Sequence, residues 1–332
     1  MEAQVYKIHS DFYYLKNEQG QTFTCKLREI LKKQKNEILV GDFVEISEDL
    51  NFITSIKKRK NSLPRPKSAN IDLALIVCSI LEPNLDYIQL NRYLTFLKYH
   101  NIDCAICFNK EDLDLNLEKT KQEIKTIYEP LGYKIFFISA KNKSHLEELS
   151  EFIKNKTTTL CGQSGAGKST LLNSLSNSNI KTGDVSTKTK RGCHTTRHCE
   201  IIEFENYKIM DTPGFSCLKF DFILPDKLLD LFDDIKSYAQ HCKYSNCLHN
   251  VQENGVCNVF DNLDKIAKSR YESYLCFLDE TLEYKKKISK QSIKKEDFKK
   301  NVGSKIITKI SKRKREESRN TSNQKFKNIK DF

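Results

Sequence analysis

A glycine-rich loop at residues 162–169 constrains the fold of this chain more than any other segment. It reads Gly-Gln-Ser-Gly-Ala-Gly-Lys-Ser, follows a short apolar strand that ends at Cys161, and precedes a predicted helix over residues 170–175. Between a strand and a helix, such a loop directs backbone N–H groups at phosphate oxygens, while its lysine reaches the β- and γ-phosphates and its serine ligates Mg²⁺. The sequence therefore predicts a nucleotide-binding α/β domain. The predicted phosphate-binding residues are Gly162, Gln163, Ser164, Gly165, Ala166, Gly167, Lys168, Ser169 and Thr170.

Two motifs before this loop indicate which base is bound. An apolar strand over residues 104–108 runs into an Asn-Lys-Glu-Asp run, whose last carboxylate can accept the N1–H and N2–H of guanine, a donor pair that adenine lacks. A Ser-Ala-Lys loop after the apolar residues 135–138 offers a backbone amide to guanine O6. GTP is the predicted ligand, and an ATPase is the disfavoured alternative. The predicted base-binding residues are Asn109, Lys110, Glu111, Asp112, Ser139, Ala140 and Lys141.

Two further motifs follow the phosphate loop. An Asp-Thr-Pro-Gly run comes after apolar residues 207–210, so Asp211 can hold the Mg²⁺ shell and Gly214 can approach the γ-phosphate. A Gly-Cys-His-Thr-Thr run at 192–196 occupies the place where a switch I threonine, Thr196, should meet Mg²⁺. The base motif thus precedes the phosphate loop, the reverse of the usual order in guanine-nucleotide enzymes. This order is compatible with one site, because nucleotide contacts depend on which strand ends lie together.

With these motifs in this order, the chain resembles the RsgA family of circularly permuted GTPases, bacterial ribosome biogenesis factors that act on the small subunit. The resemblance covers about residues 1–284 and includes four short sequence motifs outside the nucleotide-binding motifs. These are Val40-Gly41-Asp42, Arg65-Pro66, Ala69-Asn70-Ile71-Asp72 and Arg270-Tyr271-Glu272-Ser273-Tyr274. In one departure, Cys193 replaces the arginine of the family's Gly-Arg-His-Thr-Thr, which puts any phosphate or rRNA contact of that arginine in doubt.

The patterns and the resemblance together divide the chain into four parts. Residues 1–65 read as five short strands, which suits a small all-β barrel; the resemblance makes it an RNA-binding OB-fold, with a structural spacer as the alternative. Residues 66–218 alternate apolar strands with amphipathic helices and are expected to form the α/β GTPase domain. Residues 219–284 are expected to form a zinc-binding helical domain, and residues 285–332 a basic tail, disordered or marginally helical.

A metal-ligating pattern lies in the third part: Cys242, Cys247, His249 and Cys257. Three thiolates and one imidazole can close a tetrahedral zinc site with no position left open for catalysis, and such a site can hold together a short region with little core. The resemblance implies the same structural zinc. The gap before Cys257 is longer than usual for the family, and His241 is the nearest substitute ligand. Buried cysteines without a metal are the alternative.

The net charge of +12 is concentrated at one end of the chain. Residues 285–332 contain 15 lysines and 3 arginines against 3 glutamates and 2 aspartates, a net +13. Such a segment suits sequence-independent contact with RNA phosphates, although a solvated tail or a nuclear-import signal has the same composition. No apolar run reaches the roughly 18 residues that span a bilayer, and no signal segment opens the chain. We expect a monomeric cytoplasmic protein that contacts no membrane.

The expected chemistry follows from a missing side chain. Phe215 occupies the position where Ras-like enzymes carry a water-orienting glutamine, and it cannot hydrogen-bond. The resemblance makes His194 the catalytic candidate, with Thr196 and Lys168 beside it; His198 is a weaker candidate. Turnover of GTP to GDP is therefore expected to be slow until the small subunit stimulates it, and hydrolysis to drive release. The alternative is an RNA-binding scaffold whose nucleotide only switches affinity.

Overall fold

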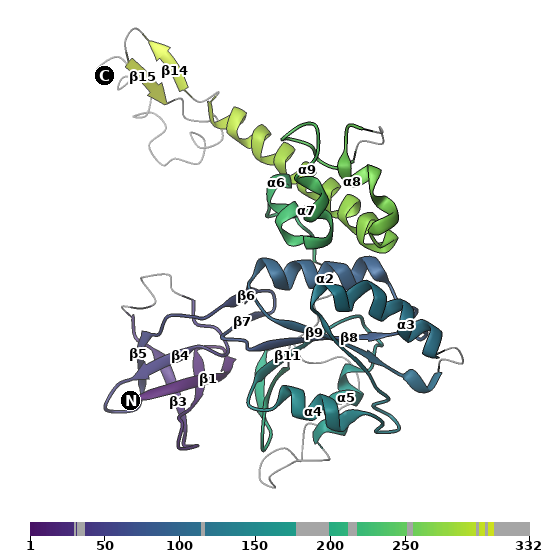
Figure 1. Ribbon diagram of the computed structural model, residues 1–332. Coiled ribbons are helices and arrows are strands. Elements are labelled where there is room, and N and C mark those ends of the chain that lie inside the picture. The colour runs from purple at the N-terminus through teal and green to yellow at the C-terminus, as the bar shows by residue number, and fades with distance from the viewer. Residues whose placement is uncertain are drawn as a thin grey trace. The chain divides into compact units, whose positions relative to one another are not determined.

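Figure 1 shows the computed structural model of the chain. It describes residues 1–29, 31, 37–113, 117–176, 199–211, 218–250, 255–296, 299–302 and 305–308, with the backbone alone from residue 291 onward. The chain forms two compact units. One contains Met1–Leu218 and Leu231–Ser273, and the other contains Lys219–Asp230 and Tyr274–Phe332.

The amino-terminal part is a five-stranded barrel, as predicted. Its strands are β1 (Glu2–His9), β2 (Phe12–Lys16), β3 (Thr22–Leu27), β4 (Phe43–Ile46) and β5 (Phe52–Ile56). They pair in the order β1-β2-β3-β5-β4, and a further pairing of β1 with β4 closes the barrel. Alternate residues point inward, so the core contains the buried side chains of Val5, Leu15, Cys25, Val44 and Ile53. Closure removes the unpaired edges that an open sheet would expose.

A mostly parallel sheet forms the predicted nucleotide-binding domain. Its parallel strands lie in the order β10 (Lys134–Phe137), β9 (Cys104–Asn109), β8 (Leu73–Ser79), β11 (Thr157–Cys161) and β13 (Lys208–Asp211). Figure 1 shows helices α2 (Tyr87–Tyr99) and α3 (Leu117–Tyr128) on one face, and α4 (Leu146–Ile153) and α5 (Lys168–Ser176) on the other. Both faces are covered, which explains the nearly continuous apolar runs of β8 and β9. Short 3₁₀ turns lie at Glu111–Leu113 and Glu129–Leu131.

Within the described residues, the barrel and the nucleotide-binding sheet form one continuous sheet of 11 strands. Strand β12 (Glu200–Glu203) is antiparallel to β13 on one side and to β1 on the other. At the junction Lys7 Nζ lies 3.2 Å from Glu200 Oε2, and Lys208 Nζ donates to Gln4 Oε1 at 3.1 Å. A separate hairpin, β6 (Ser62–Pro64) with β7 (Lys67–Ala69), follows the barrel. The sequence patterns predicted neither the continuous sheet nor this hairpin.

The carboxyl-terminal part is mainly helical. It contains α6 (Pro225–Leu228), α7 (Asp233–Ala239), α8 (Asn258–Asp261) and α9 (Lys268–Glu296), with 3₁₀ turns at Leu229–Leu231 and Leu263–Lys265. Residues 285–296 of the basic tail continue α9, and β14 (Lys299–Val302) pairs with β15 (Lys305–Thr308). Residues 309–332 lie outside the described part of the chain. Among the described residues, no helix combines the length and the apolar character needed to cross a membrane.

Candidate functional site

The predicted nucleotide-binding loops meet at one edge of the sheet. Strands β9, β11 and β13 end at Asn109, Cys161 and Asp211, and β10 leads into Ser139. These strands are parallel, so their carboxyl ends lie along the same edge, where open α/β sheets bind ligands. The pairings therefore bring together loops that are far apart in the sequence.

The phosphate loop connects β11 to α5 and needs glycine at two positions. Gly162 has a φ of +134°, and a Cβ there would lie 2.0 Å from the carbonyl oxygen of Val77. Gly167 has a φ of +90°, and its Cβ would lie 2.3 Å from Asn109 Nδ2. Both distances are too short for any side chain, and both φ values favour glycine. The glycines thus allow the loop to pack against β8 and against the base-recognition motif.

Lys168 closes the phosphate loop in this structure. Its Nζ donates to the carbonyl oxygens of Gly162 and Gln163, at 2.7 Å each. Burial lowers the pKa of Lys168, because desolvation penalises its charge. Ser169 and Thr170 are exposed in the first turn of α5, where the helix dipole and free N–H groups attract anions.

Asn109 joins the three loops of the nucleotide site. Its Nδ2 donates to the carbonyl oxygen of Ala166 in the phosphate loop at 3.0 Å. Its Oδ1 accepts from the backbone N–H of Lys110 and of Ala140, at 2.9 Å each. The side chain is 2% exposed, so these bonds are shielded from water. One buried amide therefore fixes the phosphate loop, the base motif and the Ser-Ala loop relative to one another.

The remaining base-motif residues divide into two groups. Asp112 and Lys141 are exposed. Ser139 and Glu111 are buried, and Ser139 Oγ accepts from the backbone N–H of Asn142 at 3.1 Å. Lys110 adopts a φ of +66°, and its Nζ donates to the carbonyl oxygen of Glu82. Two of the predicted base-binding residues therefore face solvent, while the others are occupied by contacts within the protein.

The switch segments are described only in part. Asp211, which is predicted to lie near Mg²⁺, ends β13 and is half-buried. Residues 177–198 and 212–217 lie outside the described residues. The predictions that fall on them concern Cys193, His194, Thr196, His198, Gly214 and Phe215.

The four predicted metal ligands lie together in the carboxyl-terminal part. One ligand atom from each of Cys242, Cys247, His249 and Cys257 falls within 4.8 Å of all the others. Cys242 Sγ lies 4.0 Å from Cys257 Sγ and 3.5 Å from His249 Nδ1. Bonds of about 2.3 Å in a zinc tetrahedron place two sulfurs about 3.8 Å apart, so the cluster fits this metal. Cys257 thus belongs to the cluster, and the substitute ligand His241 does not.

Buried polar contacts lie near the Cys-His cluster, and the sequence patterns did not assign them. Tyr271 Oη donates to the carbonyl oxygen of His249 at 2.8 Å. Arg270, which is 2% exposed, contacts the Asp234 carboxylate through Nε at 2.8 Å and Nη2 at 3.1 Å. Its Nη1 donates to Asn91 Oδ1 on α2 at 3.0 Å. Arg270 and Tyr271 therefore have a structural role near the predicted metal ligands. The sequence did not indicate Asn91 and Asp234 as their partners because both residues are distant from Arg270 along the chain.

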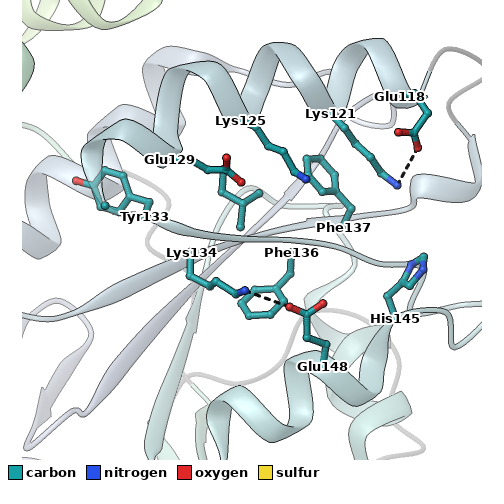
Figure 2. A pocket seen from close by; sticks show the side chains of 12 residues that line it. Glu118, Lys121, Lys125, Glu129, Tyr133, Lys134, Phe136, Phe137, His145 and Glu148 are labelled. Carbon is teal, nitrogen blue, oxygen red and sulfur yellow. Dashed lines mark hydrogen bonds and ion pairs between the residues drawn. The ribbon is translucent and has the colours of Figure 1, made fainter.

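A groove of about 580 Å³ lies along the outer strand β10. Figure 2 shows its lining, which is mainly charged, with Lys121 and Lys125 from α3, Lys134 from β10 and Glu148 from α4. Among the predicted nucleotide and metal ligands that the structure describes, none lines this groove. His145, which does line it, also contacts Glu111 of the base motif.

Comparisons with known proteins agree with this geometry. Residues 56–221 match the RsgA GTPase family, residues 2–52 the RsgA N-terminal domain, and residues 157–297 the 50S ribosome-binding GTPase family. The chain is 39% identical over 290 residues to the small ribosomal subunit biogenesis GTPase RsgA of Clostridium beijerinckii, covering 86% of this chain and 99% of that protein. It is 38% identical over 287 residues to the protein of that name from Clostridium perfringens, covering 85% and 98%.

Two solved structures are also similar. YjeQ from Thermotoga maritima superposes with a TM-score of 0.72 at 30% identity, covering 85% of this chain and 98% of that one. YloQ, described as a circularly permuted GTPase, superposes with a TM-score of 0.69 at 32% identity, covering 85% and 95%. The order of motifs, the fold and these matches agree, and the chain belongs to the RsgA family of GTPases.

Proposed function

We propose that this protein binds the small ribosomal subunit and hydrolyses GTP to GDP and phosphate during late subunit maturation, with hydrolysis stimulated by the subunit and driving release. The main supporting observation is the buried Asn109 side chain, which joins the base motif to the phosphate loop. Relatives named small ribosomal subunit biogenesis GTPases support the choice of partner. We further propose that the protein acts as a monomer in the cytoplasm, where small subunits mature.

The phosphates are proposed to lie on the loop at residues 162–169. Lys168 would exchange the carbonyl oxygens of Gly162 and Gln163 for the β- and γ-phosphates, which offer full negative charge to a partly buried ammonium group. Mg²⁺ would neutralise phosphate charge, held by Ser169, Thr196 and Asp211 directly or through water. Gly214 would approach the γ-phosphate.

Guanine recognition is proposed to depend on two exposed groups. Asp112 would accept the N1–H and N2–H of the base. The backbone amides of Ala140 and Asn142 already donate within the protein, so we propose that the amide of Lys141 donates to guanine O6. Asn109 and Lys110 would support this base site, and Ser139 would shape the loop that holds Lys141.

The Asp112→Asn variant is expected to lose its preference for guanine. An asparagine offers one acceptor and two donors, so it can no longer accept both guanine protons. Loss of a charge-assisted pair of hydrogen bonds should weaken GTP binding by about 100-fold or more. Competition of GTP, ATP and XTP for the protein measures this. An unchanged GTP over ATP preference would disprove the base assignment.

The outer face of the barrel supports RNA binding. Phe12 and Phe52 are 41% and 38% exposed, and exposed Lys26 lies between them. Lys26 Nζ lies 5.0 Å from the Phe12 ring centroid, and Lys26 is the cross-strand partner of Phe52. Aromatic rings interleaved with a cation offer stacking to unpaired bases and charge to phosphates. We propose that this Phe12-Lys26-Phe52 row contacts rRNA.

Replacing Phe12 and Phe52 with alanine should weaken binding to small subunits about tenfold or more. Each stacked base contributes roughly 1–3 kcal/mol, so two lost stacks account for at least this effect. Co-sedimentation with purified small subunits measures the affinity. Ile88→Ala is the matched control, because Ile88 is 40% exposed but lies on α2. Equal affinities of the double variant and the wild type would favour the spacer interpretation of the barrel.

The other two parts are proposed to support subunit binding. The cluster of Cys242, Cys247, His249 and Cys257 is proposed to hold one structural zinc ion. The basic segment 285–332 is proposed to contact rRNA phosphates through charge. We propose that the chain is divided into domains at residues 1–65, 66–218, 219–284 and 285–332. Residues 2–52 and 56–221 match two separate family models, which supports two distinct amino-terminal domains.

GTP turnover with and without purified small subunits tests the proposed function. A subunit-stimulated GTPase should release phosphate slowly alone and much faster with subunits, as partner proteins accelerate other GTPases by roughly 10³- to 10⁵-fold. A nucleotide-switched RNA-binding scaffold would show no turnover above background in either condition, while its subunit affinity would still depend on the bound nucleotide.

A further inference from the structure

Glu111, the third residue of the Asn-Lys-Glu-Asp run, is directed into the protein. Its side chain is 7% exposed, whereas its neighbour Asp112 is exposed. Glu111 Oε1 accepts from Ser144 Oγ at 2.8 Å and lies 2.6 Å from His145 Nδ1. Its Oε2 lies 3.4 Å from Lys121 Nζ on α3. Burying a carboxylate costs desolvation free energy, so these three polar contacts are needed to stabilise Glu111 in its buried position.

These contacts close the loop that carries Lys141. Ser139 N–H donates to the Ser144 carbonyl oxygen at 3.3 Å, and Ser144 N–H donates to the Ser139 carbonyl oxygen at 3.1 Å. The backbone N–H of Glu111 donates to the carbonyl oxygen of Ile138, just before this loop, at 3.1 Å. Its carboxylate reaches Ser144 and His145, at the end of the same loop. Glu111 thus holds the loop at both of its ends.

Two neighbouring residues adopt backbone conformations that need support. Lys110, directly before Glu111, has a φ of +66°, and His145 has a φ of +58°. Left-handed conformations are disfavoured for residues other than glycine, and they persist where surrounding contacts require them. Figure 2 shows His145 on the loop after β10, and Lys121 on α3 with its ion pair to Glu118. The contacts of Glu111 therefore come from both the loop and the helix.

We propose that Glu111 is a positioning residue that sets purine specificity. This proposal rests on the proposed function, because it concerns the same guanine site. One peptide bond separates Glu111 from Asp112, and the loop that Glu111 closes carries the Lys141 amide. By fixing both segments to each other, Glu111 holds the Asp112 carboxylate and the Lys141 N–H at one edge of the base. Without it, each group is free to move independently, and the selectivity for the 2-amino group of guanine falls.

The test measures binding of GDP and IDP to full-length variants, since hypoxanthine lacks the 2-amino group that Asp112 would bind. Glu111→Ala should weaken GDP binding about tenfold or more and bring the GDP to IDP affinity ratio close to one. Glu111→Gln still accepts from the Ser144 hydroxyl, so its ratio should be intermediate. Glu118→Gln is the matched control, because Glu118 also pairs with Lys121 but is 90% exposed and should leave both affinities unchanged.

The outcomes separate positioning from stability. Thermal unfolding is measured on the same samples, and a lower melting temperature with an unchanged GDP to IDP ratio would overturn the proposal. If Glu111→Ala does not fold, Ser144→Ala decides the question, since it removes one partner and leaves the carboxylate; a ratio equal to that of the wild type then refutes the role. A wild-type protein without any preference for GDP over IDP would instead contradict the proposed function.

Discussion

The Cys257→Ser variant is expected to lose its metal and the folded structure around the cluster. The region has short helices, α7 of 7 residues and α8 of 4 residues, which cannot be stable alone in water. In small zinc domains metal binding supplies about 10–16 kcal/mol of folding free energy, so losing one ligand should destabilise this region by several kcal/mol. Metal analysis should show one zinc ion per wild-type chain and less than that in the variant. Chelation should melt the wild-type region in the same way.

A control variant separates the loss of a metal ligand from the loss of any cysteine. Cys276→Ser changes a partly exposed cysteine that does not belong to the cluster, so it should keep one zinc ion and the wild-type unfolding curve. Limited proteolysis within residues 231–273 reports on the local fold. Full zinc content in Cys257→Ser, or a chelated protein that unfolds like the untreated one, would contradict a structural metal site.

The His194→Ala variant should lose subunit-stimulated turnover by about 10³-fold while binding GTP nearly as the wild type does. The reason is the apolar Phe215, which cannot orient the attacking water, so another group must do so. His194 would contact that water and not the nucleotide, which leaves ground-state affinity unaffected. Single-turnover hydrolysis with saturating small subunits, beside nucleotide titrations, measures both quantities.

His198→Ala is the comparison variant, because it removes the second histidine of the same segment. It should keep most of the stimulated rate. Wild-type stimulated turnover in His194→Ala would reject the catalytic role of His194. A loss of stimulated turnover in His198→Ala alone would assign that role to His198. Equal losses in both variants together with weaker subunit binding would instead indicate that the segment contacts rRNA.

Much of the fold was predictable because its signals are local. The five short strands predicted in residues 1–65 correspond to β1 to β5, and the alternation of strands and helices predicted from residue 66 onward is found in the α/β domain. Alternating apolar residues, turn glycines and strand-loop-helix motifs act over a few positions, so they can be recognised without knowing the partners. The phosphate loop is the clearest case, since its glycines, lysine and serine lie at fixed short spacing between a strand and a helix.

Other features depend on partners that are distant in the sequence. The pairing of β12 with β1 joins residues about 190 positions apart, and no local pattern indicates which strand edge remains free for it. Glu111 was predicted among the GTP-binding residues, and its buried side chain contacts Ser144 and His145, whereas the neighbouring Asp112 is exposed. Spacing within the motif cannot determine which carboxylate points inward.

The amino-acid sequence by itself predicted GTP as the ligand, the nucleotide-binding motifs in their permuted order and the four Cys and His residues that cluster in the structure, since each is defined by residue types at short spacing. Only the tertiary structure decided that Asn109 would join three loops, that Arg270 would be buried against Asp234, and that the barrel would continue the central sheet. The physical reason is that side-chain chemistry is carried by single residues, whereas burial and hydrogen-bond partners are set by which surfaces meet when the chain folds.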